Sequence, residues 1–94
     1  MNVSEAKVRT ANAVSYMKQL CRHWAHRFPV EFTDEDGRIE LPQTLCTLTA
    51  TPSFLGIRLD VQGEEVQTKM EGVVAEHLRR FGFKEDLVFD WIRS

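Results

Sequence analysis

The chain has few of the residues and runs that mark several classes of protein. Its 94 residues contain two cysteines and five isolated glycines. Two cysteines cannot form the disulfide framework of a small secreted domain, and isolated glycines do not make a phosphate-binding loop. No apolar run reaches the ~20 residues that span a bilayer. These shortages argue against a disulfide-rich, phosphate-cradling or membrane-spanning protein.

Positive charge is also scarce, because the formal net charge is −2 at pH 7 and the basic residues are scattered. Nucleic acids and anionic membranes require a clustered basic face, so we expect neither as a partner. The first residues, MNVSEAKVRT, are charged where a signal peptide needs an apolar core. We therefore expect a cytoplasmic protein in which Cys21 and Cys46 remain free, buried thiols.

Size and composition predict one small folded domain over residues 1–94. Hydrophobic residues make up 43% and charged residues 28%, close to the values of globular proteins. A chain of this length buries roughly 60–65% of the surface that its unfolded form exposes. We expect one core and no separate large pocket.

Two stretches have apolar residues at helical spacing. The first runs from 11 to 28, with Thr10 as a candidate N-cap and Pro29 preventing continuation. The second runs from 63 to 81, with acidic residues in its first turn and Gly82 placed for the left-handed conformation that ends many helices. The predicted apolar face of the second helix is Val66, Met70, Val73, Val74, Leu78 and Phe81.

Other segments alternate with a period of two, which is typical of strands. They predict an edge strand over 5–9, a hairpin over 30–41 with its turn at 34–37, and two strands over 45–50 and 55–61. Residues 84–92 favour a further strand, with a short helix as the alternative. Because one face is apolar and the other polar, we predict an α+β fold. It is an antiparallel sheet of four or five strands with two helices packed on one face, in the order β-α-β-β-β-β-α-β, the first strand being optional.

The segment YMKQLCRHWAHR, at 16–27, is rich in residue types that bind zinc or iron. On an unbroken helix Cys21 lies ~160° from His23 and ~140° from His26, so its thiol points away from both imidazoles. Cys21 is therefore expected to be a small core residue. His23 and His26 are only ~60° apart on a stripe that includes Tyr16. They form either a polar rim or a contact for a ligand or metal ion.

His77 falls within the apolar stripe of the second helix. An unpaired buried imidazole would cost on the order of 1–3 kcal/mol, so a carbonyl, Tyr16, Cys46 or a ligand should satisfy it. The two helices bring His77 and His23 together only if the Tyr16 flank of the first helix faces the second. If the small-residue flank that holds Cys21 faces the second helix instead, His23 and His77 stay apart. Since small residues favour close packing, we expect them to stay apart.

No catalytic arrangement is visible, because the chain shows no nucleophile with a base and no paired carboxylates. A thiolate pair of Cys46 with His77 is conceivable, but apolar surroundings disfavour it. We expect no enzymatic activity. The acidic run at 34–36 is interpreted as the tip of the hairpin.

Two separated motifs, YMKQLCRHWAHR and VVAEHLRRFGFKEDL at 73–87, with Trp91 after them, resemble a bacterial family catalogued as domain of unknown function 2218. The resemblance begins at AKVRTANA, at 6–13. Its matching positions are Tyr16, Leu20, Cys21, His23, His26, His77, Leu78, Phe81 and Glu85. Members resemble stand-alone small proteins or domains joined to siderophore-interacting, FAD-dependent ferric reductases, which implies a link to siderophore or iron metabolism. The family has no assigned catalytic residues to carry over.

The favoured hypothesis is a non-enzymatic binding or accessory module. Its candidate contacts for a ligand, or for a transition metal such as zinc or iron, are Tyr16, His23, His26 and His77. The alternative is a structural interaction domain without metal chemistry. In that case the exposed sheet face or an edge strand binds a reductase domain or a second copy of the chain.

Overall fold

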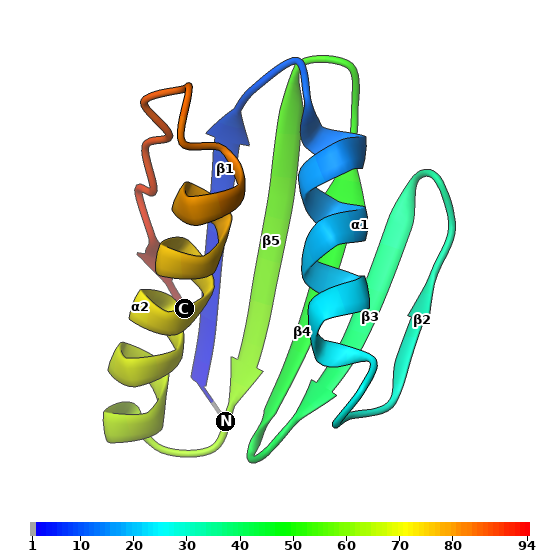
Figure 1. Cartoon of the computed structure of the whole chain (residues 1–94). Coiled ribbons are helices and arrows are strands. Elements are labelled where there is room, and N and C mark those ends of the chain that lie inside the picture. The colour runs from blue at the N-terminus through cyan, green and yellow to red at the C-terminus, as the bar shows by residue number, and fades with distance from the viewer. Residues whose placement is uncertain (1) are drawn as a thin grey trace.

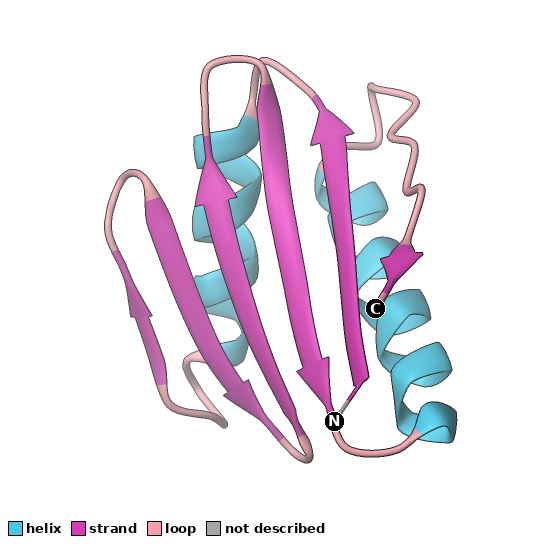
Figure 2. Ribbon diagram, turned by 180° about the vertical axis from the view of Figure 1, so that it is seen from behind, coloured by secondary structure: helices cyan, strands magenta, loops and turns pink. Residues whose placement is uncertain are grey.

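A six-stranded antiparallel sheet is covered on one face by two helices in the computed structural model, which describes residues 2–94 (Figures 1 and 2). The predicted α+β class and the placement of both helices on one face are confirmed, with one strand more than the upper prediction. The strands lie in the order β2-β3-β4-β5-β1-β6. The elements are β1 Asn2–Arg9, α1 Ala13–Trp24, β2 Val30–Phe32, β3 Asp36–Leu41, β4 Thr44–Ala50, β5 Phe54–Val61, α2 Glu64–Phe81 and β6 Ile92–Arg93.

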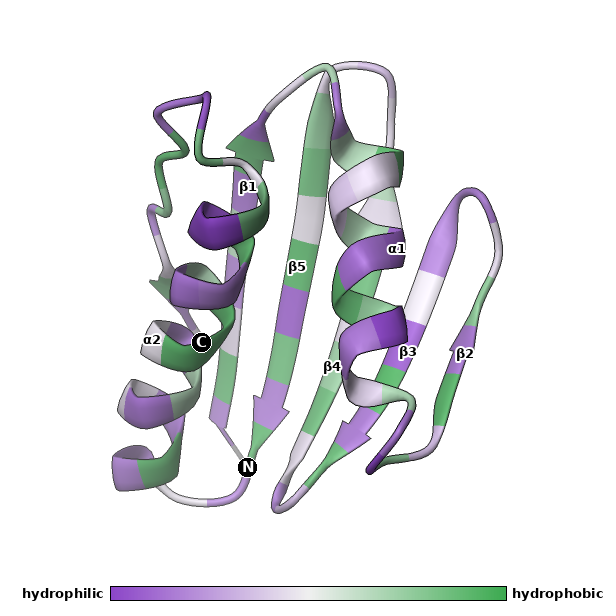
Figure 3. Ribbon diagram, viewed as in Figure 1, coloured by the Kyte–Doolittle hydropathy of each residue, from purple (hydrophilic) through white to green (hydrophobic). Residues whose placement is uncertain are grey.

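The four central segments of the chain form the predicted meander, β2 to β5. Cys46 of β4 pairs with Ile39 of β3 on one side and with Leu59 of β5 on the other. All three are fully buried, because alternate residues of an antiparallel strand face the same layer. Hydrophobic and hydrophilic residues accordingly alternate along β5 (Figure 3).

The sequence predicted that the first strand lies at an edge of the sheet. This prediction is wrong, because β1 lies between β5 and β6. The predicted strand near the C-terminus is also mostly wrong, as is the alternative helix. Only Ile92–Arg93 pairs, with Ser4 and Glu5. The preceding residues are irregular, and Leu87 among them is buried against the end of α2 at Gly82.

Helix α1 is shorter than predicted at both ends. Its N-cap is Asn12 and not Thr10. The hydroxyl of Thr10 instead accepts a hydrogen bond from the Asn12 N–H (3.0 Å) and donates one to Glu85 (2.9 Å). At the other end α1 stops at Trp24, and the N–H of Phe28 bonds to the Trp24 carbonyl (2.9 Å) in a turn that leads into β2.

Helix α2 begins one residue later than predicted and ends where predicted, but the role predicted for Gly82 is wrong. Its φ is −97°, which is not left-handed. A glycine is needed there for close approach, because a Cβ would lie 2.9 Å from Tyr16 Cζ and 2.9 Å from Leu87 Cδ1. Gly82 therefore sets how closely the end of α2 meets α1.

The buried face of α2 is rotated from the predicted one and includes two polar residues, Gln67 and Glu71. The Ser4 hydroxyl donates to Glu71 (2.5 Å), and the Gln67 amide donates to Ser4 (2.8 Å). The guanidinium of Arg93 donates to both Glu71 oxygens at 3.0 Å. Arg93 lowers the pKa of Glu71, against the raising effect of burial. The network explains why polar residues face the sheet and why β6 stays attached.

The hydrophobic core lies between the helices and the sheet. Helix α1 packs on β2 to β5, and α2 packs on β1 and β5. From α1, Met17, Leu20 and Cys21 are fully buried, whereas Val14 is exposed. Neither helix of residues 2–94 combines the length and the apolar character needed to cross a membrane.

Candidate functional site

The two helices meet along a seam of imidazole and aromatic rings. The ring centre of His23 on α1 lies 4.9 Å from that of His77 on α2. The Trp24 ring lies 5.0 Å from His77, and the Phe81 ring lies 6.2 Å from His23. The seam therefore places two imidazoles between two aromatic side chains.

The expectation that these two histidines stay apart is wrong, because the Tyr16 flank of α1 faces α2. The small-residue flank of α1, which holds Cys21, packs against the sheet. Cys21 faces the sheet so closely that a Cβ on Gly37 of β3 would lie 3.0 Å from its Sγ atom. Close packing by a small residue thus occurs between α1 and the sheet, which turns His23 toward α2.

The His77 ring makes a hydrogen bond within its own helix. Its Nδ1 lies 2.7 Å from the Val73 carbonyl oxygen. A carbonyl only accepts hydrogen bonds, so Nδ1 carries the proton and Nε2 of the neutral ring keeps its lone pair. The sequence prediction that a backbone carbonyl is one way to satisfy His77 is confirmed. Nε2 remains available to a metal ion or a hydrogen-bond donor.

His26 does not join the pair. It is exposed, and it lies beyond the end of α1 at Trp24, so the helical spacing that predicted a shared stripe with His23 no longer applies. Across residues 2–94, no three side chains of His, Cys, Asp or Glu come together in a way that could hold a metal ion. A site at the seam would therefore have two protein ligands.

The Tyr16 end of the seam carries a carboxylate with several donors. The Tyr16 hydroxyl donates to Glu85, as do the Thr10 hydroxyl (2.9 Å) and the Asn12 amide (2.9 Å). Tyr16 first, then Asn12 and Thr10, lower the pKa of Glu85. The hydrogen bond to Glu85, followed by burial, raises the pKa of Tyr16. Tyr16 is thus a structural partner of Glu85 and is engaged away from the two imidazoles.

Both thiols are free and buried, as predicted. Burial raises the pKa of Cys21 to about 11. Burial first, and the neighbouring Cys21 second, raise the pKa of Cys46 to about 12. Neither group is a thiolate near neutral pH, so they are poor nucleophiles.

Within residues 2–94, no element covers the sheet face opposite the helices (Figure 2). It carries a hollow of about 720 Å³. Its floor is Gly56 of β5, which pairs with Lys7 of β1 and Thr49 of β4. A Cβ on Gly56 would be 3.6 Å from both the Phe54 ring and the Thr49 carbonyl oxygen, which is ordinary contact. The hollow therefore has room for an added side chain.

The cations around this hollow are already engaged. Arg58 donates two hydrogen bonds to Asp60, at 3.1 and 3.2 Å, and this contact raises the pKa of Arg58. The Lys7 ammonium lies 5.1 Å from the centre of the Phe54 ring. Both positive groups therefore have partners, and the carboxylates of Glu5 and Asp90 also line the hollow.

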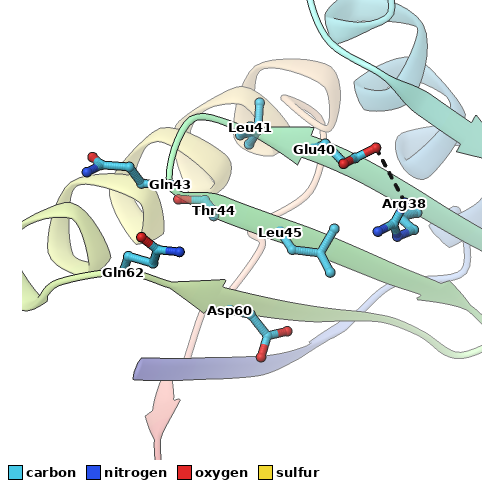
Figure 4. A pocket seen from close by; sticks show the side chains of 8 residues that line it. All are labelled: Arg38, Glu40, Leu41, Gln43, Thr44, Leu45, Asp60 and Gln62. Atoms are coloured by element: carbon cyan, nitrogen blue, oxygen red, sulfur yellow. Dashed lines mark hydrogen bonds and ion pairs between the residues drawn. The ribbon is translucent and has the colours of Figure 1, made fainter. Parts of the chain in front are cut away.

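A smaller hollow of about 520 Å³ lies at the end of β3, β4 and β5 (Figure 4). The Gln43 and Gln62 side chains flank Thr44 there, and an Arg38–Glu40 ion pair (3.5 Å) lies farther along. Gln43 has a φ of 56°, in the turn between β3 and β4. Within residues 2–94, Thr44 Oγ1 is the one buried side-chain polar atom without a hydrogen-bond partner.

Sequence reasoning identified His23, His77 and Tyr16 but missed the role of Gly56. A signal was present, because Gly56 lies inside a strand of the predicted sheet. A glycine inside a strand often marks a bulge or the close approach of another group. Phe81 was assigned to the apolar face of the second helix, and its ring in addition lies 6.2 Å from that of His23, while the Trp24 ring lies 5.0 Å from that of His77.

Comparisons with known proteins agree with this fold. The family model described as "Uncharacterized protein conserved in bacteria (DUF2218)" matches residues 5–92. The NMR structure of PA4090 from Pseudomonas aeruginosa is similar, with a TM-score of 0.83 and 38% sequence identity over 98% of this chain and 96% of that chain. No curated protein matches the chain.

Proposed function

The chain belongs to the bacterial family DUF2218, and we propose that it is a non-enzymatic accessory module that binds another protein through the open face of its sheet. The observation that carries this proposal is the hollow above Gly56, where β1, β4 and β5 lie side by side on that face. The low reactivity expected of the two buried thiols supports a binding role over a nucleophilic one.

Gly56 has no reason inside the chain to be a glycine. At Gly37 and Gly82 a Cβ would come within 3.0 and 2.9 Å of a neighbouring side chain, whereas at Gly56 it would make ordinary contacts. A glycine in a strand interior costs roughly 0.5–1 kcal/mol relative to alanine. The space above Gly56 therefore serves a group that comes from outside the chain.

The open face carries both uncharged and charged side chains. Thr47, Thr49 and Phe54 line the hollow together with the charged residues Glu5, Lys7, Arg58 and Asp90, and Arg58 is paired with Asp60. Protein interfaces commonly carry polar and charged residues around their contacts. The molecule extends 32 × 27 × 20 Å, and the face occupies its broad side (Figure 2). That area is enough for the ~800 Å² per partner of a standard interface.

The resemblance to domains joined to siderophore-interacting, FAD-dependent ferric reductases supplies the partner that we propose. In this proposal a protruding apolar side chain of the reductase enters the hollow, and the module works in the cytoplasm, where its thiols stay reduced. Neither nucleic acid nor membrane takes part.

The test is a titration of ¹⁵N-labelled protein with a purified siderophore-interacting ferric reductase. We expect chemical-shift changes centred on Thr49, Gly56 and Arg58. The variant Gly56→Val places a side chain in the hollow, with ordinary contacts at its Cβ, and should abolish these changes while leaving the spectrum of a folded protein. Gly72→Ala is the matched control, because Gly72 is exposed on α2 with nothing within 4 Å of an added Cβ.

Two results would contradict the proposal. One is a set of shifts confined to the helical side, and the other is binding that Gly56→Val leaves intact. A third result would change the partner only. If the mass of the protein alone rises with its concentration, and Gly56→Val abolishes that rise, then the face binds a second copy of this chain.

A further inference from the structure

We propose that His23 and His77 form a two-imidazole site for a divalent first-row transition-metal ion at the seam between α1 and α2. Imidazole is a ligand that Cu²⁺, Zn²⁺ and Ni²⁺ share. The site lies on the helical side of the molecule and is independent of the open sheet face (Figure 1). It adds a metal-binding activity to the docking function.

The separation of the rings fits a shared ion. Two imidazoles bound to one tetrahedral ion, with metal–nitrogen distances of about 2.0–2.1 Å, place their ring centres about 5 Å apart. The ring centres of His23 and His77 lie 4.9 Å apart, and the ring planes are tilted by 56°. Because each ring comes from a different helix, one ion would join α1 to α2.

His77 has the tautomer of a metal ligand. Imidazoles that bind metals commonly donate their second ring N–H to a carbonyl or carboxylate, which fixes the tautomer. His77 donates Nδ1–H to the Val73 carbonyl at 2.7 Å, so Nε2 is the atom left to coordinate. The partner is a backbone group of the same helix, and α2 therefore holds the ring in place.

The surroundings leave the site open on one side. His23 is exposed, so water can complete the coordination of an ion there. The Trp24 ring lies 5.0 Å from His77 and the Phe81 ring 6.2 Å from His23, and these rings line the other sides. Two protein ligands and bound water make a site that discriminates little by geometry, so affinities should follow the order in which Cu²⁺ exceeds Zn²⁺.

The chain contains its own reporter for the experiment. It has two tryptophans, and Trp91→Phe leaves Trp24 as the single fluorophore beside His77. Titration of metal-free Trp91→Phe protein with Cu²⁺ should quench Trp24 saturably at one ion per chain. Titration of the wild-type protein with Zn²⁺ should shift the imidazole NMR signals of His23 and His77 and leave those of His26 in place.

His26 supplies the matched control, because it is an exposed histidine outside the seam. His23→Ala should weaken Zn²⁺ binding at least about tenfold, since losing even an outer-shell partner of a metal site costs 10–100-fold. His26→Ala should bind as the wild type does. Because the side chain of His23 is exposed, its removal tests the site even where His77→Ala fails to fold.

Imidazole signals that stay unchanged in a large molar excess of Zn²⁺ would overturn the proposal. Equal loss of binding in His23→Ala and His26→Ala would do so as well, because the ion would then lie elsewhere. The docking function is tested separately. Gly56→Val should leave Zn²⁺ binding intact, so the failure of one proposal is distinguishable from the failure of the other.

Discussion

The hydroxyl of Tyr16 donates a hydrogen bond to the carboxylate of Glu85, and this contact joins the first helix to the segment that follows the second. Thr10 donates to the same carboxylate from the loop before α1. Tyr16 and His23 lie on one flank of α1, so the contact helps to hold the helix in the orientation that brings His23 to His77.

Acid is expected to weaken this link. Hydrogen bonds from Tyr16 and its neighbours lower the pKa of Glu85 in the folded chain. As the pH falls below the ordinary glutamate value of about 4.3, the unfolded chain takes up a proton before the folded chain does. Stability is therefore present above that value and is lost as the pH falls through the lower folded pKa. Glu85→Gln should be less stable at neutral pH and should lose less stability on acidification, as measured by urea unfolding at each pH.

Glu71, whose pKa Arg93 lowers, adds a second acid-sensitive contribution. Glu85→Gln should therefore retain part of the pH dependence. The control is Glu76→Gln, which removes an exposed carboxylate of α2 and leaves the Tyr16–Glu85 contact intact. The explanation is wrong if Glu85→Gln follows the wild-type pH dependence throughout.

Replacing Gly72 within α2 and Gly82 at its C-terminal end by alanine should have opposite effects on the stability of the protein. Gly82→Ala places a Cβ 2.9 Å from both Tyr16 and Leu87, so it should destabilise by about 1–3 kcal/mol through overpacking. Gly72→Ala meets nothing within 4 Å on the exposed side and should stabilise by about 0.8–1.0 kcal/mol through helix propensity. Thermal and urea unfolding measure both. A neutral Gly82→Ala would show that α2 ends without the close approach to Tyr16.

The sheet was predictable because its strands carry their own pattern. In β4 and β5 every second residue, such as Leu48 and Leu59, is apolar and buried. The buried face of α2 was not predictable, since Gln67 and Glu71 are typical of an exposed side. Their burial depends on Ser4 and Arg93, which are distant in sequence, and a satisfied polar network is visible only once its members are placed together.

The candidate site was predictable in its residues and not in its assembly. Helical spacing identified His23 and His77 separately, but their meeting depends on which flank of α1 faces α2. That choice follows from the fit of Cys21 against Gly37 and from the approach of Gly82 to Tyr16. Both are contacts between distant segments, so a periodic pattern within one segment does not reveal them.

The thiols should react slowly in the native protein. With pKa values raised to about 11 at Cys21 and about 12 at Cys46, almost no thiolate forms near neutral pH, and both groups are buried. Iodoacetamide at neutral pH should therefore modify native protein far more slowly than protein unfolded in urea, as followed by mass spectrometry. Fast modification of either thiol in the folded protein would revive the enzymatic hypothesis.

Gly37 and Cys21 should be energetically coupled. A Cβ on Gly37 would lie 3.0 Å from Cys21 Sγ and 3.4 Å from Met17 Cγ, so Gly37→Ala should destabilise by about 1–3 kcal/mol. Cys21→Ala alone removes a buried atom and should also destabilise. In the double variant the two changes compensate, because the new methyl group fills space that the sulfur leaves. The loss should be smaller than the sum of the single losses by about 0.5 kcal/mol or more in urea unfolding. Strict additivity would mean that Gly37 is free to move away from α1.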